Sequence, residues 1–132
     1  MNNTQKYILV VTAVLILVFV AWGVSKAVQE NNVPKTEVVA LAQCLASKKV
    51  TMYGAYWCSH CQNQKALFGD AFKYVPYVEC TENEKSCTSK GVQGFPTWLV
   101  PDASGVETKL EGEQSFEALS KASECPLTQV SK

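Results

Sequence analysis

The chain has 132 residues, 47% of them hydrophobic, which is enough for one compact domain but not for two ordinary ones. Its twelve basic residues are all lysines, and they balance twelve acidic residues to a formal net charge of zero. A chain without net charge does not attract nucleic acid, and without arginine it lacks the usual bidentate phosphate ligand. These features exclude nucleic-acid binding.

The N-terminal part predicts a membrane segment followed by a tether. Residues 7–24 are apolar apart from Thr12, and a helix of this length rises roughly 27 Å, close to the hydrocarbon thickness of a bilayer. We expect a short tail (1–6), a transmembrane anchor (7–24) and a polar tether (25–35). A signal peptide cleaved at residues 25–27 and a buried core helix are alternatives. Signal peptides have shorter apolar cores, however, and a helix apolar on every face needs a larger protein around it.

The six cysteines indicate that the globular part lies in an oxidising compartment, because cysteine-dense small domains belong to such environments. The flanking charges do not set the orientation, since Lys6 precedes the apolar segment and Lys26 follows it. We therefore predict a single-pass cell-membrane protein whose globular part is extracytoplasmic, either periplasmic or extracellular.

The hydrophobic pattern after the tether predicts a series of helices and strands. Thr36 is a candidate helix N-cap, and the apolar positions of residues 36–48 fall on one helical face. A buried strand, a helix, a short strand, a polar loop or short helix, two strands and a last helix follow, at residues 50–56, 59–74, 77–80, 81–89, 97–100, 106–110 and 116–122. The two later helices are predicted from apolar stripes formed by Leu67, Phe68, Ala71, Phe72 and Val75, and by Phe116, Leu119 and Ala122. This order predicts an α/β fold with a small central sheet.

The first buried strand leads into the sequence Cys58-Ser59-His60-Cys61. Cys58 falls at a helix N-terminus, where unpaired backbone N–H groups and the helix dipole stabilise a thiolate. Cys61, one turn further on, lies on nearly the same face, close enough to form a disulfide with Cys58. His60 lies between them, and an imidazole near the sulfur would further favour the thiolate and make the disulfide a better oxidant. We interpret the pair as a candidate redox centre.

Three other interpretations of the pair are open. It is a plain structural disulfide if it is packed inside, although Tyr56, Trp57 and the polar residues 62–64 favour an accessible edge. A zinc site would add Cys80 and Cys87, but six residues between these are too many for a tight zinc knuckle. A copper relay built from the pair and its histidine lacks a methionine-rich stretch or a second histidine. We expect no metal and no cofactor.

A second motif, Gly94-Phe95-Pro96-Thr97, stands before the third strand; taken alone, its proline has only the small general chance of being cis. Together with Trp57-Cys58-x-x-Cys61 at the end of an apolar strand, this motif makes the chain resemble the thioredoxin superfamily. The segments KVTMYGAYWCSHCQNQKALFGDAF, VPYVEC, GVQGFPTW and EGEQSFEALSKASECP are similar to the thioredoxin-like domain fused to bacterial and plant homologues of vitamin K epoxide reductase (VKOR).

The resemblance covers residues 36–126 and implies a thioredoxin-like domain there, followed by a C-terminal tail over 127–132. It also implies a protein thiol-disulfide oxidoreductase. It makes Cys58 the attacking and Cys61 the resolving cysteine, and makes residues 94–96, with a cis Pro96, a binding site for substrate backbone. Ser59 stands where the family often has proline, so with Trp57 and His60 it bears on the redox potential. Trp57 and Phe95 are candidates for an apolar surface beside the sulfur, whereas Trp98 is expected mainly in the core.

The four remaining cysteines allow three pairings, which spacing alone does not rank. The resemblance implies a Cys80–Cys87 disulfide, either structural or an electron relay to the first pair. Cys44–Cys125 then follows by elimination, with buried free thiols as the alternative.

In the resembling family, the domain passes oxidising equivalents between a membrane quinone reductase and folding proteins. The four-helix quinone-reducing domain is absent from this chain, so we expect a separate VKOR-like or DsbB-like membrane oxidase as partner. Reduced or misoxidised exported proteins are the expected substrates of a disulfide donor. A disulfide reductase or isomerase, a copper- or zinc-binding chaperone and a redox-inert interaction module remain alternatives.

Overall fold

The computed structural model describes residues 2–27 and 33–127, and divides into two units, Met1–Val33 and Pro34–Lys132. The first unit contains α1 (Asn3–Ala27), whose Asn3–Val20 segment is long and apolar enough to cross a membrane. Outside the described residues lie residue 1 of the predicted N-terminal tail, 28–32 of the predicted tether and 128–132 of the predicted C-terminal tail.

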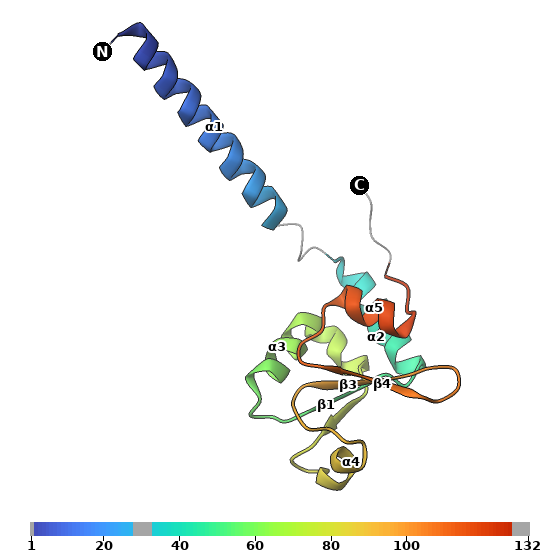
Figure 1. Cartoon of the computed structure of the whole chain (residues 1–132). Helices are drawn as coiled ribbons and strands as arrows, with labels where there is room; N and C mark the ends of the chain where they lie inside the picture. The colour runs from blue at the N-terminus through green and yellow to red at the C-terminus, as the bar shows by residue number, and fades with distance from the viewer. Residues whose placement is uncertain (1, 28–32, 128–132) are drawn as a thin grey trace. The chain divides into compact units, whose positions relative to one another are not determined.

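The second unit is a mixed four-stranded sheet flanked by helices (Figure 1). Its elements are α2 (Lys35–Ser47), β1 (Thr51–Gly54), α3 (Ser59–Phe68), the 3-10 helix η2 (Gly69–Tyr74), β2 (Tyr77–Glu79), α4 (Glu84–Ser89), β3 (Thr97–Pro101), β4 (Glu107–Glu111) and α5 (Phe116–Ser123). The strand order is β2-β1-β3-β4, with β1 and β2 parallel and the other two pairs antiparallel. The predicted α/β class and element order are confirmed.

The register of β1 separates two faces of the sheet, because successive strand side chains point to opposite sides. Met52 pairs with Tyr77 and Trp98, and the Trp98 ring packs 6.0 Å from that of Phe68 in α3. This side of the sheet is therefore the α3 face. Tyr53, the next residue of β1, points to the opposite side of the sheet. There it belongs to a buried cluster with Cys80, Cys87 and Leu99, which defines the α4 face. Each face thus has its own core.

The start of α2 differs from the prediction. The N-cap is Pro34, which makes no side-chain capping bond; its carbonyl accepts the N–H groups of Glu37 at 2.9 Å and Val38 at 3.2 Å. The prediction of Thr36 as N-cap is wrong, because the backbone of Pro34 already turns the chain into the helix.

The predicted helix over residues 59–74 is interrupted. α3 ends at Phe68, since Gly69 adopts φ +55°, a conformation that favours glycine, and a 3-10 helix follows. Leu67 is exposed, because the buried face of α3 is formed by Cys61, Gln64 and Phe68. In α5 the structure likewise buries Ser123 and exposes Ala122. Ser123 tolerates burial because its hydroxyl donates to the Leu119 carbonyl at 2.6 Å.

Two disulfides lie in this unit, and their loop lengths differ: Cys44–Cys125 spans 81 residues of sequence and Cys80–Cys87 only 7. Because a cross-link that closes a longer loop removes more entropy from the unfolded chain, Cys44→Ala/Cys125→Ala should lower the free energy of unfolding by roughly 4 kcal/mol. The matched Cys80→Ala/Cys87→Ala variant should lose roughly 2 kcal/mol. Urea denaturation of the full chain in detergent measures both losses. A larger loss for the second variant would contradict the loop-length argument.

Candidate redox site

The two cysteines of the C-x-x-C sequence meet at the N-terminus of α3. Cys58 is the N-cap in extended conformation, and its Sγ accepts the Cys61 N–H at 3.2 Å. Both cysteines are free thiols with their sulfur atoms 2.6 Å apart. The N-cap position places Cys58 against the unpaired N–H groups and positive dipole end of the helix, which stabilise negative charge on its sulfur.

The two sulfurs have unequal environments. Cys61 is 0% exposed and Cys58 is 6% exposed, so only Cys58 reaches the surface. Burial, together with the hydrogen bond to Cys58, raises the pKa of Cys61 to about 12. Cys61 therefore keeps its proton at neutral pH. This asymmetry suits Cys58 as the attacking cysteine and Cys61 as a second thiol that is shielded from solvent.

Gln64, predicted to mark an accessible edge, is instead 1% exposed. Its Oε1 accepts the backbone N–H of Gln114 at 2.6 Å and the indole N–H of Trp98 at 3.4 Å, and its Nε2 donates to the Gln114 carbonyl at 3.0 Å. These bonds pin α3 to β3 and to the loop between β4 and α5. The prediction is wrong because Gln64 finds its partners only where the fold brings distant segments together.

His60 is exposed at the start of α3, and its partner is an acidic side chain. Its Nδ1 lies 2.6 Å from Oε1 of Glu113 in the β4–α5 loop, and Asn63 donates to the same oxygen at 3.1 Å. The hydrogen bonds from His60 and Asn63 lower the pKa of Glu113. The imidazole is thus held by a carboxylate that sequence reasoning missed, since nothing in the local sequence marks Glu113.

The loop before β3 contacts Trp57, the residue that precedes Cys58. The Phe95–Pro96 peptide bond is cis, and the Pro96 carbonyl accepts the Gly112 N–H at 2.8 Å. The Phe95 ring meets that of Trp57 edge-on, with centroids 6.0 Å apart. Trp57 is 65% exposed, so these rings form an apolar surface next to Cys58, whereas Trp98 is fully buried.

A second polar pair, missed by the sequence, lies on the α3 face at the end of β2. The Tyr77 hydroxyl donates to Oε2 of Glu79 at 2.6 Å, and Oε1 of Glu79 accepts the Tyr56 N–H at 3.1 Å. Burial and the bond to Glu79 raise the pKa of Tyr77. Burial raises the pKa of Glu79, but the hydrogen bonds from Tyr77, Thr81 and the Tyr56 backbone together outweigh it and lower the pKa. Because Tyr77 and Glu79 alternate with an apolar residue in a short strand, the pattern predicted only a strand.

The Cys80–Cys87 disulfide lies on the α4 face, packed with Tyr53 and Leu99. Cys61 lies on the α3 face, where it adjoins Gly54, so the sheet separates the two pairs. Because exchange needs direct sulfur-to-sulfur attack, this placement favours a structural disulfide over a relay. The bond also occupies both sulfurs required by the zinc interpretation. Among the described residues, no group of three or more His, Cys, Asp or Glu could hold a metal ion.

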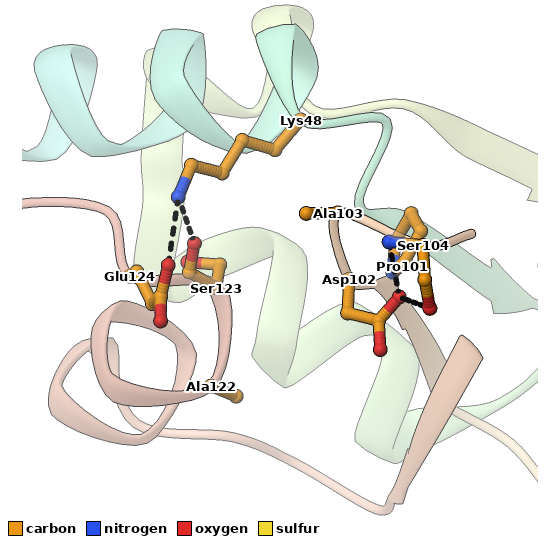
Figure 2. A pocket seen from close by; sticks show the side chains of 8 residues that line it. All are labelled: Lys48, Pro101, Asp102, Ala103, Ser104, Ala122, Ser123 and Glu124. Carbon is orange, nitrogen blue, oxygen red and sulfur yellow. Dashed lines mark hydrogen bonds and ion pairs between the residues drawn. The ribbon is translucent and has the colours of Figure 1, made fainter. Parts of the chain in front are cut away.

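A hollow of about 610 Å³ lies at the other end of the sheet (Figure 2). Lys48 lines it just before β1, whereas Cys58 follows that strand, so the hollow is remote from the cysteine pair. The Lys48 ammonium is already engaged there, donating to the Ser123 carbonyl at 2.6 Å and pairing with Glu124 at 3.8 Å. The hollow is therefore not part of the candidate redox site.

Comparison with known proteins gives a family match, described as thioredoxin, over residues 32–124. The chain is 45% identical over 73 residues to thiol-disulfide oxidoreductase LTO1 of Arabidopsis thaliana, covering 48% of this chain and 19% of the relative. It is 32% identical over 102 residues to protein disulfide isomerase-like 2-2 of Oryza sativa subsp. japonica, covering 64% and 27%. The chain thus spans less than a third of the length of these curated relatives.

Solved structures give weaker likenesses. Thioredoxin NaTrxh from Nicotiana alata aligns with a TM-score of 0.47 and 22% identity over 58% of this chain and 70% of that one. A malarial protein aligns with a TM-score of 0.49 and 20% identity over 57% of this chain and 91% of that one. The family match, in contrast, takes in most of the chain, including Cys58, Cys61 and the cis proline. This chain belongs to the thioredoxin family.

Proposed function

We propose that this protein is a thiol-disulfide oxidoreductase that exchanges disulfides through Cys58 and Cys61. The observation that carries the proposal is the geometry of the pair. Cys58 caps α3, and the sulfur of the buried Cys61 lies 2.6 Å from its sulfur. The names of the relatives, a thiol-disulfide oxidoreductase and protein disulfide isomerase-like proteins, support it.

As a disulfide donor, the protein starts with Cys58 and Cys61 joined. A substrate thiolate attacks Cys58 Sγ, the Cys58–Cys61 bond breaks, and Cys61 leaves with its electron pair and takes up a proton. A second substrate thiolate then attacks the substrate sulfur of the mixed disulfide and releases Cys58 as a thiolate. The substrate loses two electrons and the cysteine pair gains them.

The donor direction is favoured by the N-cap position of Cys58. Stabilising the thiolate stabilises the reduced pair, which makes its disulfide the stronger oxidant. The exposed rings of Tyr56 and Trp57 beside this sulfur suit the apolar side chains of incompletely folded proteins. We therefore assign reduced or misoxidised exported proteins as substrates. Reduction or isomerisation at the same two cysteines is the competing direction.

The anchoring of the domain rests on α1. This apolar helix would hold the domain at a membrane surface, where tethering raises the effective concentration of a membrane-bound partner. Together with the resemblance to domains fused to VKOR homologues, the helix supports reoxidation by a separate VKOR-like or DsbB-like oxidase. The cysteine content supports an extracytoplasmic position of the domain.

Replacing the resolving cysteine should trap substrates. Cys61→Ala should accumulate mixed disulfides through Cys58, because the second thiol that releases a bound substrate is gone. Non-reducing electrophoresis and mass spectrometry of the captured species would identify exported proteins and the oxidase. The Cys58→Ala/Cys61→Ala control should capture none, and absence of adducts from the single variant would count for a redox-inert module.

The redox potential should separate donor from reductase. Equilibration of the full chain with glutathione buffers should give a value nearer about −120 mV, typical of a strong oxidant, than about −270 mV, typical of thioredoxin. Because Cys80 and Cys87 lie on the opposite face of the sheet, Cys80→Ala/Cys87→Ala should keep this value. A potential at or below the thioredoxin figure would support the reductase instead.

A reporter enzyme that is active only outside the cytoplasm should test the topology. Fused to the C-terminus, it should be active, because we place the globular unit on the extracytoplasmic side of α1. The same fusion with residues 3–27 deleted should be inactive. Activity of a cytoplasm-specific reporter at the same position would contradict the assigned orientation.

A further inference from the structure

Exchange at the redox pair requires a proton to enter or leave Cys61, yet this side chain is 0% exposed. Solvent therefore cannot serve directly as the proton donor or acceptor. The titratable and charged groups that interact with it are Cys58 at the start of its helix, Lys65 on the same helix and Tyr77 from β2. Tyr77 in turn is hydrogen-bonded to Glu79. The exposed His60 is held by Glu113 at the helix surface, away from this buried position.

Tyr77 and Cys61 approach the same point above β1. A Cβ atom added to Gly54 would lie 3.0 Å from Cys61 Sγ and 3.3 Å from the Tyr77 hydroxyl. The missing side chain of Gly54 thus leaves the thiol and the phenol adjoining one small space. Negative charge on Cys61 also contributes to raising the pKa of Tyr77, as expected for neighbouring groups.

Glu79 connects Tyr77 with the protein surface. Its carboxylate accepts the Tyr77 hydroxyl at 2.6 Å, and it is only half-buried. Two other donors, the Tyr56 N–H and the Thr81 hydroxyl, hold its second oxygen at 3.1 Å and 2.7 Å. The Lys65 ammonium lies 3.8 Å from the centroid of the Tyr77 ring and so fixes the ring from its face. A chain of polar groups thus runs from beside Cys61 to solvent.

We propose that Tyr77 and Glu79 form the proton relay of Cys61, a role that rests on the proposed function of the cysteine pair. When Cys61 resolves a mixed disulfide, its S–H proton passes to the Tyr77 oxygen while the Tyr77 proton passes to the Glu79 carboxylate. The Cys61 thiolate then attacks Cys58 Sγ, and the substrate sulfur leaves with the electron pair of the broken bond. Glu79 afterwards releases its proton to water. In the donor direction the same path runs in reverse.

A symmetric nitrobenzoate disulfide, whose thiolate is coloured, separates the two steps in the reduced full chain in detergent. Attack by Cys58 releases the first coloured thiolate, and resolution by Cys61 releases the second. Tyr77→Phe and Glu79→Gln should keep the first rate within about twofold but slow the second about tenfold or more at neutral pH. The deficit should shrink as pH rises, because hydroxide increasingly removes the Cys61 proton.

The controls distinguish a relay from a merely structural role. Tyr74→Phe makes the same substitution at an exposed tyrosine of η2 outside the relay, so both rates should be preserved, and Glu79→Asp should partly rescue the second. A second phase unchanged in Tyr77→Phe, or slowed by the same factor at every pH, would overturn the relay. Because phenylalanine keeps the ring, Tyr77→Phe decides the question even if Glu79→Gln does not fold. Release of only one thiolate by the wild-type chain would overturn the proposed role of Cys61 itself.

Discussion

The site depends on how the first turn of α3 is seated at the end of β1. The strand ends at Gly54, and Cys58 then caps the helix while Cys61, one turn later, returns beneath it against the sheet. A single hydrogen bond, from the Cys61 N–H to the Cys58 sulfur, expresses this constraint. It places the slightly exposed Cys58 sulfur at the N-terminus of the helix and leaves Cys61 fully buried. The two cysteines therefore differ in exposure and in position relative to the helix dipole, two properties that control thiol reactivity.

The sheet lets the protein use cysteine chemistry in two ways without interference. On the α3 face, the redox pair is surrounded by polar groups, Tyr77 and Glu79 below it and the Gln64 bonds beside it. On the α4 face, the Cys80–Cys87 disulfide is packed in an apolar cluster. Because strand residues alternate between the faces, a shift of one position carries a side chain from one environment to the other.

The secondary structure could be predicted largely from the sequence, because apolar periodicity and turn residues are local signals. The order of elements and the α/β class are those expected, while the ends of elements differ. Pro34 caps α2 where Thr36 was expected to, and Gly69 divides one predicted helix into α3 and η2. The apolar stripes also predicted that Leu67 and Ala122 are buried, whereas both are exposed. A polar side chain with a hydrogen-bond partner, such as Ser123, can occupy a buried position instead.

The sequence by itself determined the residues capable of chemistry: a C-x-x-C pair at a strand-to-helix junction and a Gly-Phe-Pro-Thr segment before a later strand. These motifs are contiguous, so their spacing is readable without a fold. Only the tertiary structure decided their surroundings. Glu113 reaches His60, Gln114 reaches Gln64, and Glu79 reaches the Tyr56 backbone across 53, 50 and 23 residues of sequence. Such contacts arise from strand order and helix packing, and no local pattern encodes them, because each residue taken alone is an ordinary polar residue.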